Sequence, residues 1–179
     1  HSRNCFRRMR ESANRSGGVK VMGIDPGSQV TGWGCVMGSG NRYQSTAAGE
    51  IRAPHGEELI DRLCRMHRCV VELLARECPD AVALETPFFA RSVHATLVLG
   101  QVRGVILLAV RDSRIEIHEY APREVKSSVV GRGGATKEQV QFMVTRLLGL
   151  AAPPPLDESD ALAVAICHHH RARRPVLSR

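Results

Sequence analysis

A short apolar run near the start of the chain ends in a carboxylate and then turns sharply. Residues 21–24 (Val-Met-Gly-Ile) are followed by Asp25 and by Pro26-Gly27. An apolar run of this length predicts a strand in the interior of a sheet, and a Pro-Gly pair predicts a turn directly after it. Asp25 therefore either caps the turn or faces a site at the end of the strand, and we favour the site.

Three further acids stand in comparable places. Glu85 closes a second continuous apolar run, 81–84, which is typical of a strand buried on both faces. Asp157 and Asp160 stand at the start of the last apolar helical pattern, and their spacing makes them neighbours on one helix face. Carboxylates that are brought together repel one another unless a cation lies among them. Oxygen ligands without thiolate or imidazole suit Mg²⁺ or Mn²⁺ better than zinc.

Each acid also has a local explanation. Asp157 alone would serve as a helix N-cap, Asp160 as an acid in the first helical turn, and Asp25 as the first residue of an Asx turn. Glu85 is the hardest to explain in this way, because a Glu at the end of a buried strand has little capping use. Taken together, the four acids favour a metal site.

The order of the remaining patterns predicts a mixed α/β fold. Strands over 32–37 and 43–51 would form an antiparallel meander with the first strand. A helix over 57–76 would cross over to 81–85 and make that strand parallel to the first, which brings Asp25 and Glu85 to one sheet edge. We therefore predict a mixed five-stranded sheet, three strands antiparallel and two parallel, with helices on both faces. The later elements are a helix over 92–110, a strand over 114–120, a helical turn from 122, a helix over 136–148 and a last helix from 157.

The positive charge lies at the two ends of the chain. The 179 residues carry a net charge of +7, which invites a nucleic-acid partner. Residues 1–20 contribute +5 and 171–179 contribute +4, so 21–170 carries −2. We interpret 1–19 as a disordered leader or an expression remnant, and an organelle transit segment is the less favoured alternative. Residues 20–172 are predicted to form one folded domain, followed by a basic tail over 173–179. DNA binding must therefore be argued from particular residues of the domain.

Cysteine and histidine usage favours a cytoplasmic protein without a zinc site. The six Cys form no Cys-x-x-Cys pair, and no secretory segment is visible. His168, His169 and His170 are interpreted as surface residues, because consecutive helix residues point in different directions and cannot converge on one ion. No apolar run approaches the roughly 20 residues that cross a bilayer, so no membrane partner is expected.

Several short motifs follow one another along the chain. The first block, 23–28, also opens sugar kinases and Hsp70-type ATPases, so the order of the whole set matters more than any single block. In that order the motifs resemble the RuvC family, the bacterial Holliday-junction resolvases. The motifs are Gly-Ile-Asp-Pro-Gly-Ser at 23–28, Thr-Gly-Trp-Gly at 31–34, Ala-Leu-Glu at 83–85, Gly-Gln-Val-Arg-Gly at 100–104, Val-Lys at 125–126, Val-Val-Gly at 129–131, Lys-Glu-Gln-Val at 137–140 and Asp-Glu-Ser-Asp-Ala-Leu-Ala at 157–163.

This resemblance implies a ribonuclease-H-like fold and a metal-dependent endonuclease that makes paired symmetric nicks in four-way DNA junctions, leaving 5′-phosphate ends. It implies that two Mg²⁺ ions, for which Mn²⁺ substitutes, are bound by Asp25, Glu85, Asp157 and Asp160. It also implies that Lys137 assists cleavage. The expected partners are junction DNA, a second copy of the chain, and a branch-migration helicase complex, in the nucleoid-associated part of the bacterial cytoplasm.

The DNA-binding residues are predicted around the same sheet edge. Phe88 and Phe89 follow Glu85 in a loop where bases would stack, although burial in the core is the usual role of Phe. The resemblance assigns stacking to Phe88 first and Phe89 second. Four basic residues are predicted to follow the phosphates, although an isolated Lys is usually a solvated surface residue. They are Arg91, Lys126, Arg132 and Lys137.

Two alternatives stay open at this point. The first is a junction-binding protein without catalytic activity, in which the carboxylates are structural. The second is a fragment of an actin-like ATPase or sugar kinase, for which the chain is too short to hold a second subdomain with another phosphate-binding loop. The apolar helix over 92–110 is equally compatible with burial under its own chain and with a homodimer interface, and the resemblance favours the interface.

Overall fold

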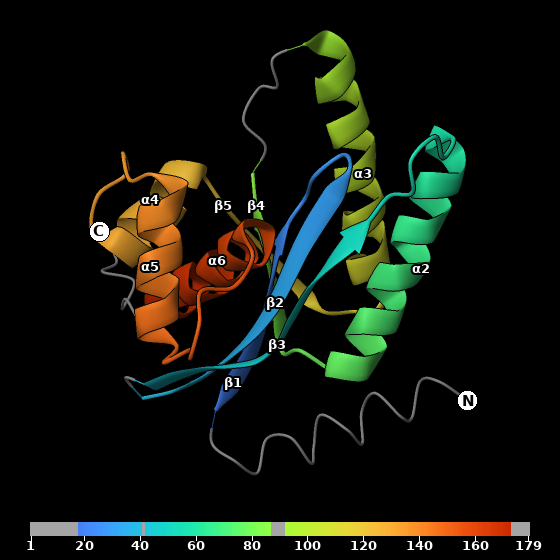
Figure 1. Ribbon diagram of the computed structural model, residues 1–179. Coiled ribbons are helices and arrows are strands. Elements are labelled where there is room, and N and C mark those ends of the chain that lie inside the picture. Colours follow the sequence, from blue (N-terminus) through green and yellow to red (C-terminus); the bar gives the residue numbers. More distant parts are fainter. Residues whose placement is uncertain (1–17, 41, 87–91, 173–179) are drawn as a thin grey trace, which may run out of the picture.

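The computed structural model describes residues 18–40, 42–86 and 92–172 (Figure 1). The described residues form one five-stranded sheet in the order β3-β2-β1-β4-β5. The antiparallel part is β1 (Val19–Asp25), β2 (Val30–Ser39) and β3 (Arg42–Arg52), and the parallel part adds β4 (Ala81–Glu85) and β5 (Glu116–Tyr120) beside β1. The predicted mixed sheet is confirmed. β1 begins at Val19, one residue before the predicted start of the domain.

β1 lies at the centre of the sheet and sets its register. Ile24 pairs with Trp33 of β2 in antiparallel register and with Leu84 of β4 in parallel register. The parallel connection runs through α2 (Leu59–Glu77), which ends because Cys78 adopts the left-handed conformation (φ 47°). This crossover confirms the predicted one. It brings the carboxyl ends of β1 and β4 to the same edge of the sheet.

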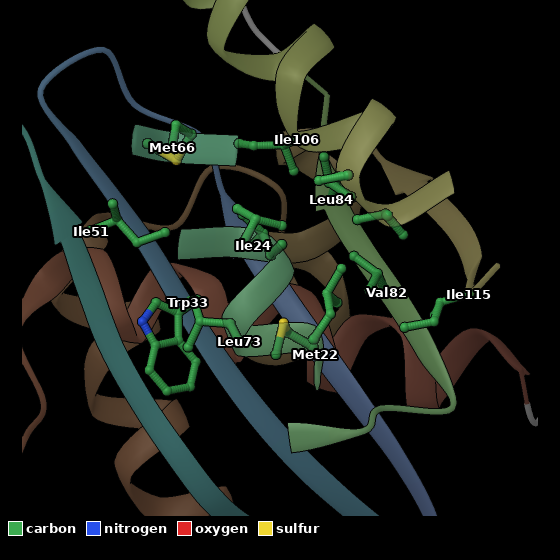
Figure 2. Packing of buried hydrophobic residues seen from close by; sticks show 14 of the residues in the cluster. Met22, Ile24, Trp33, Ile51, Met66, Leu73, Val82, Leu84, Ile106 and Ile115 are labelled. Carbon is green, nitrogen blue, oxygen red and sulfur yellow. The ribbon is translucent and has the colours of Figure 1, made fainter. Parts of the chain in front are cut away.

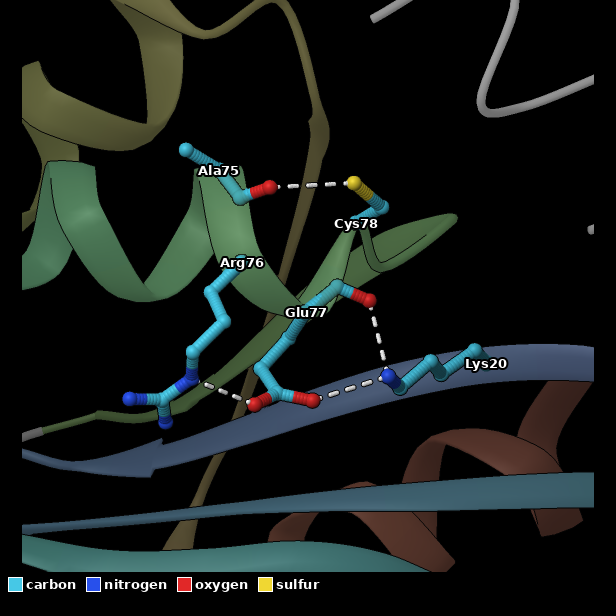
Figure 3. A network of polar contacts seen from close by, with 5 residues as sticks. All are labelled: Lys20, Ala75, Arg76, Glu77 and Cys78. Atoms are coloured by element: carbon cyan, nitrogen blue, oxygen red, sulfur yellow. Dashed lines mark hydrogen bonds and ion pairs between the residues drawn. The ribbon is translucent and has the colours of Figure 1, made fainter.

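A polar network fixes the opposite end of the crossover (Figure 3). The Lys20 ammonium of β1 donates to the backbone carbonyl of Glu77 (2.8 Å) and to its carboxylate (2.9 Å). Arg76 also donates to that carboxylate (2.8 Å), and the Lys20 backbone N–H donates to Asp80 Oδ2 (2.8 Å). Because the Lys20 and Glu77 side chains are mostly buried, these charge-assisted contacts hold the end of α2 against β1.

Helices cover both faces of the sheet, as predicted (Figure 1). On one face, α2 and α3 (Val93–Asp112) enclose an apolar core that includes Met22, Ile24, Leu84 and Ile106 (Figure 2). The other face is covered by α4 (Pro122–Val130), α5 (Lys137–Leu147) and α6 (Leu156–Ala172). α6 packs directly on β1, and a Cβ on Gly23 would lie 1.9 Å from the Ala161 carbonyl oxygen. Gly23 is thus required by the close approach of strand and helix.

α3 is more apolar than its packing needs. Val102, Ile106 and Val110 are buried in the core, whereas Val93 and Leu97 on the same helix are more than half exposed. By length and composition α3 could cross a membrane, which corrects the expectation that no apolar segment has that length. Polar residues at 94, 101 and 103 interrupt its apolar pattern, so the sequence shows no continuous apolar run of that length. A single helix of this kind is weak support for a membrane span, since an apolar helix packed on a sheet meets the same criteria.

The interpretation of His168 and His169 as surface residues is wrong, whereas His170 is partly exposed. His168 and His169 are buried, and a hydrogen bond joins His168 Nδ1 to Tyr120 Oη (2.8 Å). Burial and, after it, the neighbouring His118 and His169 together lower the pKa of His168 from 6.5 to about 4. The physical reason is that the sheet and the other helices cover α6 up to its last turn, so its end lies inside the protein.

Candidate active site

The two strand-end acids lie side by side at the carboxyl edge of the sheet. Asp25 is the last residue of β1, Glu85 is the last residue of β4, and the residues before them are paired in the parallel ladder. Both line one cavity of about 420 Å³, to which Asp160 and Lys137 also contribute. The sheet therefore delivers two carboxylates to one cavity by backbone register alone.

The environment of these acids favours a nearby positive charge. Burial and, after it, the negative charges of Glu85, Asp160 and Asp157 together raise the pKa of Asp25 from 3.8 to about 7, although the Lys137 ammonium opposes the rise. Burial also raises the pKa of Glu85 from 4.5 to about 7, with Asp160 adding to the rise. Because Coulomb interactions weaken with distance, these mutual effects identify one cluster of acids.

Lys137 is the counter-charge within this cluster. It is the first residue of α5, where Thr136 and Gln139 form a capping box, and its Nζ lies 2.5 Å from Asp160 Oδ2. Burial alone would lower the pKa of Lys137, but the hydrogen bond to Asp160 and the charges of Asp25 and Asp157 raise it overall. The ammonium therefore stays protonated at the wall of the cavity.

Asp157 approaches the site from the first turn of α6. The Ser159 N–H donates to the Pro155 carbonyl (2.9 Å), so the helical hydrogen bonds begin at Pro155 and the alternative role of Asp157 as N-cap is wrong. The main chain can come this close because residue 32 is Gly, where a Cβ would lie 2.0 Å from the Asp157 carbonyl oxygen. Asp157 does not line the cavity, but its charge acts on Asp25.

The donor set fits a divalent cation such as Mg²⁺. It consists of carboxylate oxygens that repel one another, two of them with pKa values raised toward neutrality. Within the described residues, however, no three His, Cys, Asp or Glu side chains converge closely enough to hold an ion as they stand. In this arrangement Lys137 supplies positive charge to the cluster through its ion pair with Asp160.

The predicted DNA-binding residues divide into three groups. Phe88, Phe89 and Arg91 lie outside the described residues. Lys126 lines the cavity of the acids, and its charge lowers the pKa of Glu85. Arg132 does not line that cavity; its guanidinium donates to Gln139 Oε1 (2.9 Å) at the start of α5.

One residue beside the acids had no predicted role. Arg103 of α3 lines a smaller cavity together with Asp25 and Glu85, and it donates to the backbone carbonyl of Glu85 (3.1 Å). The available signal was an arginine in the middle of an apolar helix, where an unpaired charge is unfavourable. The lining of the larger cavity also includes Arg123 and Gly133, which had no predicted role there.

A mixed five-stranded sheet with acids at the ends of β1 and β4 and in the first turn of α6 defines an α/β nuclease of the ribonuclease-H-like class. The chain belongs to the RuvC family, since the family profile described as crossover junction endodeoxyribonuclease RuvC matches residues 21–168. This confirms the resemblance of its motifs.

Relatives and solved structures agree with this assignment. The RuvC of Granulibacter bethesdensis is 46% identical over 162 residues, which cover 90% of this chain and 91% of the relative. The RuvC of Chlorobium phaeovibrioides is 48% identical over 149 residues, covering 82% of this chain and 79% of the relative. The structure of Thermus thermophilus RuvC in complex with Holliday junction substrate superposes with a TM-score of 0.82 at 35% identity, covering 87% of this chain and 95% of that one. The yeast mitochondrial Holliday junction resolvase Ydc2, at 11% identity and a TM-score of 0.61 (92% of this chain, 85% of that one), shares the fold.

Proposed function

We propose that this protein is a Holliday-junction resolvase, an endonuclease that hydrolyses phosphodiesters in four-way DNA junctions. One observation carries the proposal: in a chain of the RuvC family, Asp25, Glu85, Asp160 and Lys137 line a single cavity at the carboxyl edge of the sheet. The structure of the Thermus thermophilus relative with junction substrate supports the choice of DNA substrate.

We assign the cation site to the four acids, with Mg²⁺ as the ion and Mn²⁺ as a substitute, two ions per site. Bound there, the ions would supply an activated water and charge stabilisation for the leaving oxygen. Asp25 and Glu85 line the cavity, and their partial burial makes negative charge there unfavourable without a cation. Asp157 and Asp160 would complete the ligand set from α6.

The basic residues act on the DNA backbone. Lys137 places a permanent positive charge at the cavity wall and would neutralise the charge that develops on the reacting phosphate. Lys126, on the same cavity, would hold the backbone in position. Phe88, Phe89 and Arg91 remain predictions for base stacking and phosphate binding next to Glu85, and Arg132 remains a predicted phosphate contact at the start of α5.

We infer that two copies act together. The exposed apolar residues Val93, Leu97 and Leu108 of α3 offer a surface that a second copy would cover. A two-fold axis between the copies would match the symmetry of the junction and yield paired nicks with 5′-phosphate ends. A branch-migration helicase complex as a further partner, and a nucleoid-associated cytoplasmic location, also belong to this proposal.

The test is cleavage of a labelled synthetic four-way junction and of a linear duplex with the same sequence, in Mg²⁺ or in EDTA. Glu85→Gln removes one ligand charge, and Glu72→Gln on the exposed side of α2 is the matched control. We expect symmetric, Mg²⁺-dependent nicking of the junction alone by the wild type and the control, and binding without nicking by Glu85→Gln. Junction binding with no nicking by the wild type in Mg²⁺ or Mn²⁺, across several core sequences, would support the non-catalytic alternative. ATP turnover would support the kinase or ATPase alternative.

A further inference from the structure

Arg103 is a mostly buried cation within an apolar helix. Its side chain is 12% exposed, and its neighbour along α3, Val102, is fully buried. Removing a guanidinium from water is unfavourable unless the group is paired and hydrogen-bonded. The contacts of Arg103 therefore explain why it lies here, and they lead to the strand end that carries Glu85.

The guanidinium holds two different elements at once. Nη1 donates to the backbone carbonyl of Glu85 at the end of β4 (3.1 Å), and Nη2 pairs with Glu119 Oε1 on β5 (2.6 Å). Glu119 precedes Tyr120, which is the partner of Glu85 in the parallel ladder. A single planar group thus joins α3, β4 and β5 at the point where Glu85 leaves the sheet.

The sheet holds Glu85 from the β5 side only. Pairing between β1 and β4 ends at Ile24 and Leu84, so Glu85 has no paired residue in β1. On the β5 side, Glu85 pairs with Tyr120, and the next N–H, that of Thr86, donates to the Tyr120 carbonyl (2.8 Å). Arg103 therefore donates to the Glu85 carbonyl directly after the last residue pair between β1 and β4.

We propose that Arg103 is a positioning residue for Glu85. Its two-pronged contact fixes the last peptide of β4 and thereby the direction in which the Glu85 carboxylate enters the cavity, so that the carboxylate is placed to bind a cation. This inference rests on the proposed function. Lysine is not equivalent, because a single ammonium lacks the rigid fork that reaches a carbonyl and a carboxylate together.

The test compares four variants in the full chain. Arg103→Met removes both contacts, Arg103→Lys keeps the charge, Glu119→Gln weakens only the β5 contact, and Arg111→Met, exposed in the last turn of α3, is the matched control. Each variant is measured for its melting temperature as a function of Mn²⁺ concentration, for junction binding in EDTA, and for single-turnover cleavage of the junction at saturating enzyme.

We expect Arg103→Met to require roughly tenfold or more Mn²⁺ for the same rise in melting temperature, and to cleave at least tenfold more slowly, as is usual when the support of a metal ligand is lost. Junction binding in EDTA should stay within about twofold of the wild type, because Arg103 donates to the protein and not to DNA. Arg103→Lys should be intermediate, Glu119→Gln milder, and Arg111→Met unchanged.

A purely structural role has a different signature. It would lower the melting temperature in EDTA but leave the Mn²⁺ dependence at the wild-type value, and that result would overturn the proposal. If Arg103→Met does not fold, Glu119→Gln decides, and an unchanged Mn²⁺ dependence overturns the proposal in that case too. A wild type whose melting temperature rises with Mn²⁺ but that does not cut junctions would refute the proposed function. In that case the Mn²⁺ dependence of the variants, compared with that of the wild type, would still test the role of Arg103.

Discussion

Replacing Asp25 by Asn should make the metal-free protein more stable while abolishing cleavage. The folded-state pKa of Asp25 is about 7, against 3.8 for the free side chain. The stability that accompanies the protonated form is fully present below pH 3.8 and is lost as the pH rises through 7. At about 1.36 kcal/mol per pKa unit, the full loss is about 4 kcal/mol at pH 8. Because Asp25 opens onto the cavity, we expect a difference of about 2 to about 4 kcal/mol.

Urea denaturation in EDTA at pH 4.5 and at pH 8 measures this difference. Asp25→Asn should match the wild type within about 1 kcal/mol at pH 4.5 and exceed it by the stated amount at pH 8, because Asn does not ionise. Adding Mg²⁺ at pH 8 should stabilise the wild type and narrow the gap, since a cation binds the folded state only. Glu72→Gln, at an exposed site on α2, should show no pH-dependent difference. Equal free energies of unfolding for Asp25→Asn and the wild type at pH 8 would show that ionised Asp25 does not destabilise the metal-free protein, which would refute this reasoning.

Three further predictions concern other parts of the molecule. Lys137→Met should slow junction cleavage by roughly a hundredfold, because the ammonium acts on the reacting phosphate. Junction binding in EDTA should change less than about threefold. A full cleavage rate in single-turnover assays would contradict this role. Gly23→Ala should destabilise the protein by about 3 kcal/mol in urea titrations, since its Cβ would lie 1.9 Å from the Ala161 carbonyl oxygen, whereas Gly134→Ala, with open space around it, should change little. Leu97→Asp should shift the protein from dimer to monomer in sedimentation experiments, because Leu97 is 63% exposed on the apolar surface of α3; an unchanged sedimentation coefficient would remove α3 from the interface.

Most of the sheet was predictable because its signals are local. The apolar runs that end at Asp25 and Glu85, with a helix between them, allow only a parallel pair with both acids at one edge, and the structure has that pair. The helix predicted over 136–148 is local in the same sense, and the structure has α5 at Lys137–Leu147. Patterns within ten or twenty residues were enough for these features.

The features that could not be predicted depend on which distant element covers a side chain. His168 and His169 lie in a run of three histidines that looks solvated, yet the sheet and helices enclose the end of α6. The contact of Arg103 with Glu85 joins residues on separate elements, and only their packing brings the guanidinium to that carbonyl. The place of Asp157 inside the first helical turn depends on the Pro155 carbonyl, which a sequence pattern fixes only to within one or two residues.

The packing of α6 on the sheet has a consequence for how the protein folds during synthesis. Among the described elements α6 is the last along the chain, yet it packs on β1, the first of them, and it carries two of the four acids. A nascent chain that has not yet reached Leu156 lacks both the cover of one sheet face and half of the ligand set. We therefore expect ribosome-bound chains truncated before Leu156 to be sensitive to protease and inactive on DNA. The order of synthesis would then keep this nuclease silent until its last helix has been translated and has docked.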